Sequence, residues 1–184
     1  MPLSEVQKIV ADDPNRFKVV VAGRRWGKIL WDPIKEKFIS CRWAKKINES
    51  DLTITLINGS KIYLRSADNI DALRGVSMSY LIMDEAAMID QKMWTEVCRP
   101  ALSDQQGGAM FVTTPKGKGS WIYELWQGAH AQDNWKSFQY TTLEGGNVPP
   151  EEIEQARNEL DEKSFRQEYE ASFEQYAGSI YYNW

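Results

Sequence analysis

The spacing of apolar and polar residues predicts strands that alternate with helices. Four segments have the length and character of strands in a sheet that other elements cover: residues 16–21, 80–83, 109–113 and 135–141. Amphipathic spacing and helix-start residues predict helices at residues 3–10, 32–43, 92–102, 121–127 and, as two helices broken near residue 161, 150–173. This alternation predicts an α/β fold, with a mainly parallel sheet flanked by helices.

A β-hairpin and a loop are also predicted. Residues 52–57 and 61–64 alternate as strands do, and they flank Asn58-Gly59, a strong two-residue hairpin turn. Residues 144–146, Glu-Gly-Gly, are predicted to form a loop before the acidic helical stretch that Pro150 opens.

The composition is that of one ordinary globular domain. With 184 residues, 42% of them hydrophobic, the chain is long enough for one α/β domain with a full core. The single histidine, His130, argues against a Ser-His-Asp triad or a His-rich metal site. Four of the eight tryptophans have charged neighbours, which is typical of core edges or of interface residues: Trp26, Trp43, Trp121 and Trp135.

The net charge of −4 is unlike that of a protein that coats nucleic acid. Any contact with DNA must therefore come from a local basic patch. The candidates are Arg42, Lys45 and Lys46, and the pair Lys116 and Lys118, although a solvated surface is the favoured explanation of each. No run reaches the ~20 apolar residues of a membrane span.

Residues 22–28, Ala-Gly-Arg-Arg-Trp-Gly-Lys, follow an apolar run and have the character of a phosphate-binding loop. Gly23 and Gly27 would let backbone N–H groups converge on a phosphate, and Lys28 would add positive charge. The pattern G-x-x-x-x-G-K-[ST] is broken twice, because Ala22 replaces the first glycine and Ile29 replaces the hydroxyl residue. Alone, the segment is explained equally well by a chance Gly-Lys turn after a strand.

The apolar run 80–83 ends in Asp84 and Glu85, which suggests a magnesium site. A strand-end Asp can hold Mg²⁺, and the acid that follows it can polarise an attacking water. The alternative is that both acids only place negative charge at a helix start. Their position downstream of a Gly-Lys loop favours the functional interpretation.

Two further segments complete the candidate chemistry. The hydroxyl pair of Thr113-Thr114-Pro115 ends the strand expected beside the Asp84 strand, and could sense a γ-phosphate; a plain strand-to-turn transition is the alternative. Arg74 lies in a polar loop, where it is either a loop charge or, in a ring-forming motor, an arginine that reaches a neighbour's phosphate.

Together these segments resemble the large terminase subunit of tailed bacteriophages. The likeness rests on residues 24–28, 73–75, 81–86 and 113–117, and it extends to residues 94–101 and 165–169 in the family's motif order. The resemblance implies a P-loop ATPase domain of the additional-strand type over residues 1–176, with residues 177–184 starting the linker to a nuclease domain. ATP and Mg²⁺ would then drive double-stranded viral DNA into a procapsid.

The resemblance also implies a role for each candidate residue. Asp84 would hold magnesium, Glu85 would be the catalytic base, Arg24 the arginine inside the phosphate loop, and Arg74 an arginine finger across a subunit interface. Phosphate binding would fall to the loop: Gly23, Arg24, Arg25, Trp26, Gly27 and Lys28. Thr113, Thr114 and Pro115 would couple hydrolysis to DNA movement, and Gln7 would read adenine.

The partners implied by the family are the portal protein and procapsid, the small terminase subunit, and further copies in a ring on the portal. The expected location is the cytoplasm of the bacterial host, with no membrane partner. Since the chain stops near the linker, no nuclease activity is expected.

One departure from the family bears on activity. Lys28 is followed at once by Ile29-Leu30-Trp31-Asp32-Pro33, which resembles sequence that in the family lies roughly thirty residues later. The metal-binding hydroxyl, the helix behind the loop and one strand are thus expected to be missing. An alternative function is a prophage-derived remnant that keeps docking surfaces without turnover. A helicase-like ATPase is a third interpretation, disfavoured because further helicase motifs are absent.

Overall fold

The computed structural model describes residues 3–25, 31–67 and 75–175. The chain divides into two compact units, a larger one of residues 1–27 and 73–184 and a smaller one of residues 28–72. Within the described ranges, every helix is too short or too polar to cross a lipid bilayer.

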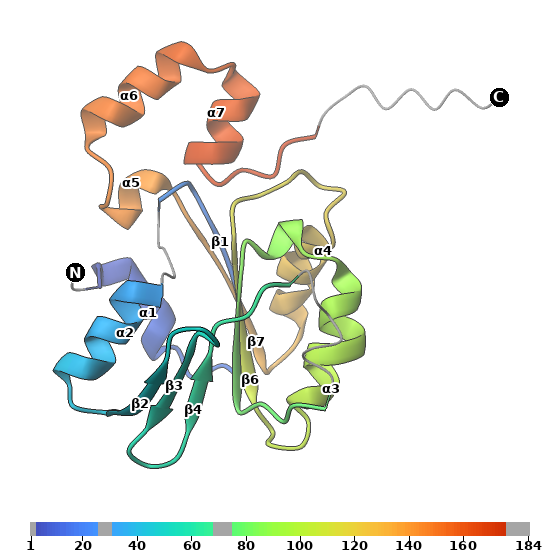
Figure 1. Ribbon diagram of the computed structural model, residues 1–184. Coiled ribbons are helices and arrows are strands. Elements are labelled where there is room, and N and C mark those ends of the chain that lie inside the picture. The colour runs from blue at the N-terminus through green and yellow to red at the C-terminus, as the bar shows by residue number, and fades with distance from the viewer. Residues whose placement is uncertain (1–2, 26–30, 68–74, 176–184) are drawn as a thin grey trace. The chain divides into compact units, whose positions relative to one another are not determined.

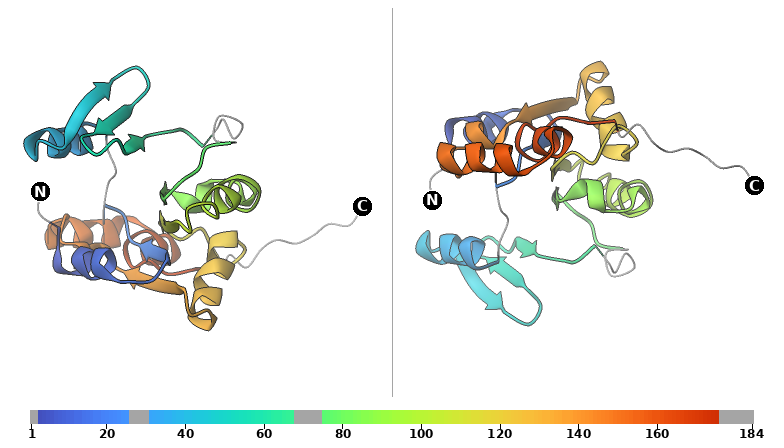
Figure 2. Two further views of the ribbon diagram at one scale, coloured as in Figure 1. Left: turned by 90° about the horizontal axis from the view of Figure 1, so that it is seen from below. Right: turned by 90° about the horizontal axis from the view of Figure 1, so that it is seen from above.

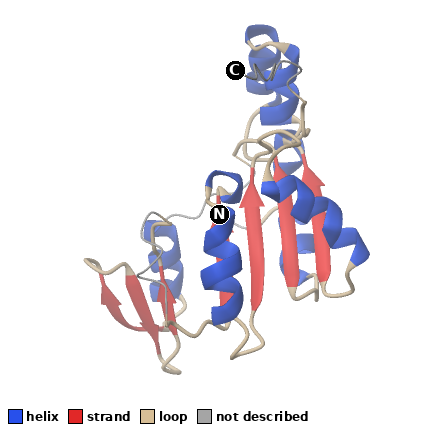
Figure 3. Ribbon diagram, turned by 90° about the vertical axis from the view of Figure 1, so that its right-hand side faces the viewer, coloured by secondary structure: helices blue, strands red, loops and turns tan. Residues whose placement is uncertain are grey.

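The larger unit is built on a parallel sheet. Its four strands among the described residues are β1 (Phe17–Ala22), β5 (Tyr80–Asp84), β6 (Gly108–Thr113) and β7 (Trp135–Tyr140). They lie in the order β5-β6-β1-β7, and every neighbouring pair is parallel. Figure 1 labels β1, β6 and β7 of this sheet, and Figure 3 draws its strands as red arrows. All four strands predicted from the sequence are confirmed. The order places β6 between β1, which leads into the glycine loop, and β5, which ends in the acids.

Helices cover both faces of this sheet. On one face, Val10 of α1 (Glu5–Asp12) packs against Val20 of β1 and Phe138 of β7. On the other face, the helical segments are η3 (Met93–Cys98), α3 (Arg99–Ala101), α4 (Trp121–Gly128) and η4 (Ala129–Ala131). Alternate residues of each strand point to opposite faces, so the central strand β1 is buried along its whole length.

An aromatic cluster forms the core on the second face. Trp94 of η3 lies edge-on to Phe111 of β6, with ring centroids 4.8 Å apart, and Trp135 stacks on Phe17 at 4.7 Å. Trp121 lies edge-on to Phe111 at 6.0 Å. Trp121 and Trp135, two of the four tryptophans with charged neighbours, are half-buried at the edge of this core, whereas Trp43 is 56% exposed and Trp26 lies outside the described residues.

Three helices lie beyond the carboxyl ends of the strands: α5 (Thr142–Gly145), α6 (Pro150–Glu159) and α7 (Glu162–Tyr169) (Figures 2 and 3). The predicted helix pair is confirmed, with Asp161 as the N-cap of α7. The predicted loop at residues 144–146 is wrong in part, because α5 runs to Gly145. Thr141 and Glu144 form a capping box that starts this helix, and Gly146 closes it in the left-handed conformation.

The smaller unit contains α2 (Trp31–Ser40) and a three-stranded antiparallel sheet. Its strands are β2 (Ala44–Asn48), β3 (Thr53–Leu56) and β4 (Lys61–Tyr63), in that order. The hairpin around Asn58-Gly59 is confirmed. Strand β2 was not predicted, because Lys45-Lys46 interrupts any alternation and the pairing with β3 shifts register there.

Candidate active site

The sheet brings three predicted segments to one edge. Parallel strands end on the same side, so residues after β1, β5 and β6 meet beyond the carboxyl ends of the strands. Asp84 pairs in register with Val112, and Val21 pairs with Thr113. The glycine loop, the acidic pair and the threonine segment are therefore neighbours, although residues 23 and 113 are far apart in the chain.

The loop begins in a tightly packed place. The Gly23 N–H donates to the carbonyl of Tyr140 at 2.9 Å. A Cβ atom on Gly23 would lie 2.6 Å from the Tyr169 carbonyl oxygen and closer still to Thr142 Oγ1, and neither contact is sterically allowed. The Thr142 hydroxyl in turn donates to the Arg24 carbonyl at 2.9 Å. Gly23 is thus required for packing against α5 and α7 as well as for the turn.

Arg24 is held by Glu168 at the end of α7. The Arg24 backbone N–H donates to the Glu168 carbonyl at 2.7 Å, and its Nε lies 2.5 Å from Glu168 Oε2. The second carboxylate oxygen, Oε1, lies 3.4 Å from Lys116 Nζ. One carboxylate therefore joins the glycine loop to the residue that follows Thr113-Thr114-Pro115.

These contacts shift the pKa of both groups. Burial alone would raise the pKa of Glu168, but the hydrogen bond from Arg24 and the positive charges of Lys116 and Arg24 outweigh it, so the pKa is lowered. The pKa of Arg24 is raised, first by the hydrogen bond and charge of Glu168 and to a lesser degree by the charges of Tyr169 and Glu85. The field of Glu85 thus reaches the guanidinium of Arg24.

Glu85 has an uncommon backbone conformation. Its φ of 50° and ψ of 41° lie in the left-handed region, which a residue with a Cβ enters only at a cost. The Glu85 N–H donates to Asp84 Oδ1 at 3.0 Å, and both residues are exposed at the strand end. The chain then turns into η2 (Ala86–Met88).

Thr113 connects β6 to this turn. Its buried hydroxyl accepts a hydrogen bond from the Ala87 N–H at 3.2 Å and donates to the Thr114 carbonyl at 3.0 Å. Thr114 and Pro115 are buried as well. A hydrogen bond thus joins the threonine segment to Ala87, two residues after Glu85.

The other predicted residues are placed as follows. Gln7 Oε1 accepts the Ser4 N–H at 3.0 Å in the capping box that starts α1. The remaining site predictions lie outside the described residues: Trp26, Gly27, Lys28 and Arg74. The same holds for Ile29, which replaces the expected hydroxyl residue.

The predicted basic patch lies in the smaller unit. Arg42, Lys45 and Lys46 line one hollow of about 410 Å³ together with Ile39, Ala44 and Ile47, and none of these described lining residues is acidic. In the larger unit, Lys116 contacts Glu168 and Lys118 is exposed.

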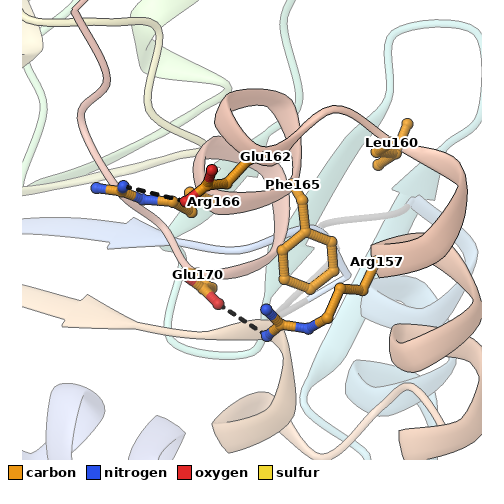
Figure 4. A pocket seen from close by; sticks show the side chains of 6 residues that line it. All are labelled: Arg157, Leu160, Glu162, Phe165, Arg166 and Glu170. Atoms are coloured by element: carbon orange, nitrogen blue, oxygen red, sulfur yellow. Dashed lines mark hydrogen bonds and ion pairs between the residues drawn. The ribbon is translucent and has the colours of Figure 1, made fainter.

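A second hollow, of about 300 Å³, lies on α6 and α7 (Figure 4). Arg157 covers the Phe165 ring at 4.3 Å and bonds to Glu170 at 2.9 Å. Arg166 pairs with Glu174 at 2.9 Å. The charged side chains at this hollow therefore pair with one another and not with a ligand. These ion pairs hold α7, the helix that carries Glu168, in place.

The sequence did not predict the part that four residues play in the site: Lys116, Thr142, Asn147 and Glu168. Lys116 was a candidate for DNA contact, and its pairing with Glu168 was not expected. Asn147 Nδ2 donates to the Arg25 carbonyl at 3.1 Å, where Arg25 has a φ of 63°. The spacing Thr141-x-x-Glu144 could have located α5 and hence Thr142. Glu168 lies in residues 165–169, which resemble the family, but it is one of many acids on an amphipathic helix and nothing local marked it as the partner of Arg24.

Over the described ranges, His, Cys, Asp and Glu side chains form no group of three or more that could enclose a metal ion. A metal bound here would need ligands from a substrate or water, as Mg²⁺ at nucleotides has.

The fold and the site define a class. In this parallel sheet, β6 is an additional strand between β1, which enters the glycine loop, and β5, which ends in two acids. This strand arrangement is that of the additional-strand P-loop NTPases. A family model described as "Terminase large subunit, T4likevirus-type, N-terminal" matches residues 34–183. The chain belongs to this family of phage terminase large subunits.

Individual proteins with similar sequences are also terminase large subunits. The terminase large subunit of Escherichia phage T5 is 36% identical over 144 residues, which cover 75% of this chain and 32% of that protein. The large subunit of Thermus virus P23-45 is 33% identical over 132 residues, covering 64% and 27%. The chain thus spans between about a quarter and a third of the length of the curated relatives it matches.

Solved structures show the same fold. The large terminase ATPase domain of Thermus phage P74-26 superposes with a TM-score of 0.74 at 22% identity, covering 94% of each chain. The large terminase of a thermophilic bacteriophage, solved in complex with ADP, gives 0.64 at 15% identity, over 89% of this chain and 42% of that one. The larger part of this chain therefore folds as a large terminase ATPase domain.

Proposed function

We propose that this chain is the ATPase motor domain of a terminase large subunit, which couples ATP hydrolysis to movement of double-stranded DNA into a procapsid. One observation carries the proposal: Arg24, the Asp84-Glu85 pair and Thr113 meet at one edge of the sheet, in the strand order of the class. The nucleotide is inferred from the large terminase of the thermophilic bacteriophage, which has been solved with ADP and with ATP-γ-S.

The residues divide the work of phosphoryl transfer. Lys28 and the loop N–H groups, with Gly23 and Gly27 allowing close approach, bind the phosphates. Arg24 adds positive charge beside them, and Arg74 is the candidate to reach the nucleotide of a neighbouring copy. Arg25, Trp26 and Gln7 complete the binding residues, Gln7 toward adenine.

Asp84 is the residue that would hold Mg²⁺. A single carboxylate suits this ion, because Mg²⁺ at nucleotides takes one or two carboxylates and completes its shell with phosphate and water. Bound Mg²⁺ neutralises charge on the phosphates.

Glu85 is the proposed base. Its carboxylate orients a water and takes its proton as the water oxygen bonds to the γ-phosphorus. The bond from phosphorus to the bridging oxygen of ADP breaks, which releases ADP and phosphate. Thr113, Thr114 and Pro115 then transmit the change to the rest of the motor.

The remaining proposals concern the whole machine. The ATPase domain spans residues 1–176 and lacks the family residues that would follow Lys28, and the linker starts at residue 177. The partners are DNA, the portal and procapsid, the small subunit and further copies in a ring, in the host cytoplasm. The basic hollow of Arg42, Lys45 and Lys46 is the proposed DNA contact.

The test is Mg²⁺-dependent release of phosphate from ATP by the purified chain. The proposal expects turnover that is lost in Glu85→Ala. Ile29→Thr, which restores the missing hydroxyl, should raise turnover because the metal gains a ligand. Absence of hydrolysis in both the natural chain and Ile29→Thr would overturn the catalytic proposal.

The second candidate function is a non-catalytic remnant that keeps docking surfaces. Ile29 is the observation that favours it, since the hydroxyl that binds metal in this class is absent. This candidate predicts no turnover and no rise in melting temperature when Mg²⁺-ATP is added.

A further inference from the structure

Two side chains from one segment hold the chain that follows Glu85. The Thr113 hydroxyl accepts the Ala87 N–H, and the Trp121 indole Nε1–H donates to the Ile89 carbonyl at 2.9 Å. Thr113 is the last residue of β6 and Trp121 the first of α4. The turn after Glu85 is therefore held near its middle and at its end.

This turn needs support from outside. Its own hydrogen bonds are those of η2, from the Met88 N–H to the Glu85 carbonyl at 2.8 Å and from the Ile89 N–H to the Ala86 carbonyl at 3.2 Å. Glu85 has a left-handed backbone, and such a conformation persists only where surrounding structure determines it. The Ile89 carbonyl lies at the end of the turn, since the next hydrogen bonds, from the Lys92 and Met93 N–H groups to Asp90, belong to the start of η3.

Trp121 is itself firmly placed. Ser120 caps α4 by accepting the Ile122 N–H, and Ile122 is fully buried. The Trp121 ring lies edge-on to Phe111, at an interplanar angle of 84°. Phe111 is buried and pairs in register with Met83, the residue before Asp84. The indole thus packs on β6, the strand that pairs with the acid-bearing strand β5.

We propose that Trp121 is a positioning residue for Glu85: its indole hydrogen bond to Ile89 sets the backbone turn that aims the Glu85 carboxylate. Trp121 touches no reacting atom, and it acts through residues 86–89. The inference rests on the proposed role of Glu85 as the base, and it adds a residue outside the motifs that the sequence suggested. It also connects the start of α4 to the acidic pair.

The chain offers a matched control in the same helix. Trp126 Nε1 donates to the Phe138 carbonyl at 3.2 Å, and both tryptophans are half-buried. Trp121→Phe and Trp126→Phe each remove one indole N–H and keep an aromatic ring. Only the first alters a bond to the turn after Glu85.

The first readout is steady-state hydrolysis together with nucleotide affinity. Trp121→Phe should lower kcat by roughly tenfold to a hundredfold, because a catalytic group that is misplaced by about 1 Å can lose a factor of that order. Affinity for ATP-γ-S should stay within about twofold, because the phosphate loop is untouched. Trp126→Phe should keep nearly the natural kcat. Equal losses of kcat in the two variants would overturn the proposal.

The second readout does not need turnover. Backbone amide hydrogen exchange of Ala87, Met88 and Ile89, followed by NMR, should be faster in Trp121→Phe and unchanged in Trp126→Phe. Unchanged exchange in Trp121→Phe would overturn the positioning role. If the natural chain shows no hydrolysis, the proposed ATPase function fails, and this exchange measurement still decides whether Trp121 sets the turn.

Discussion

At the scale of the residue, Glu168 is the group that joins the two halves of the site. Its carboxylate contacts Arg24 of the glycine loop and Lys116 beyond the threonine segment, from helix α7, to which the sequence assigned no role in the site. The side chain is 15% exposed, so these charge contacts are only partly screened by water. The arrangement gives the fold a dependence on pH that can be measured.

Glu168→Gln should flatten the acid side of the stability profile. The pKa of Glu168 is lowered by folding, so its contribution is present above its ordinary value of 4.5 and is lost as the pH falls through the lowered pKa. The natural chain should lose free energy of unfolding more steeply between about pH 5 and pH 3 than the variant does. Urea unfolding at a series of pH values measures this. Glu162→Gln in the same helix is the control, because the Glu162 side chain is 87% exposed. Identical acid slopes for Glu168→Gln and the natural chain would contradict it.

The two cysteines should differ in reactivity. Burial raises the pKa of Cys98 to about 11, whereas Cys41 is exposed. The thiolate is the reactive form, so a disulfide reagent at pH 8 should modify one thiol quickly and the second only after unfolding. Cys41→Ser should abolish the fast phase. Two fast equivalents in the native chain would show that Cys98 is accessible.

At the scale of the element, the junction between β1 and the start of the glycine loop depends on a glycine. The start of the loop is pressed against α5 and α7, and this packing leaves no room for a side chain at position 23. The same junction positions Arg24 against Glu168. A change of one methyl group here should therefore disturb two helices and the loop together.

Gly23→Ala should destabilise the larger unit by roughly 1–3 kcal/mol, the usual effect of overpacking. A new Cβ would clash with Thr142 and with the Tyr169 carbonyl oxygen. These include backbone atoms of α5 and α7, so the clash can be relieved only if the helices move. Gly119→Ala is the matched control, because a Cβ there meets no atom within 4 Å. Thermal unfolding of both variants tests this. Equal stability of the two would mean that α5 and α7 shift freely.

Local pattern predicted most elements, and its failures have physical causes. The strands and the final helix pair follow from apolar spacing that neighbouring residues determine. Strand β2 escaped prediction because its pairing depends on a register shift opposite β3. Helix α5 escaped because Gly145 and Gly146 suggest a loop, while the capping box at Thr141 and Glu144 outweighs them.

At the scale of the whole molecule, the net charge of −4 is compatible with DNA binding only through a local surface. The hollow in the smaller unit gathers Arg42, Lys45 and Lys46, and its described lining contains no acidic residue. The larger unit holds the candidate chemistry. The two tasks of the proposed motor would thus fall to different units of the chain.

Replacing Lys45 and Lys46 by Ala together should weaken binding to double-stranded DNA of any sequence. Each lysine that neutralises a phosphate contributes about 0.9 to the slope of log affinity against log salt, so the slope should fall by up to twice that amount. Fluorescence anisotropy at several salt concentrations measures it, with exposed Lys163→Ala as control. An unchanged slope would exclude this hollow as the DNA contact.

The sequence by itself determined the α/β class, the glycine loop, the acidic pair and the family, because apolar period and short motifs depend on residues close in the chain. Only the tertiary structure decided which groups meet them. Arg24 and Glu168 are 144 residues apart, and Trp121 and Ile89 are 32 apart. Such contacts follow from the order β5-β6-β1-β7, which brings the ends of distant strands to one edge. Strand order depends on packing of the whole core, and no local pattern encodes it.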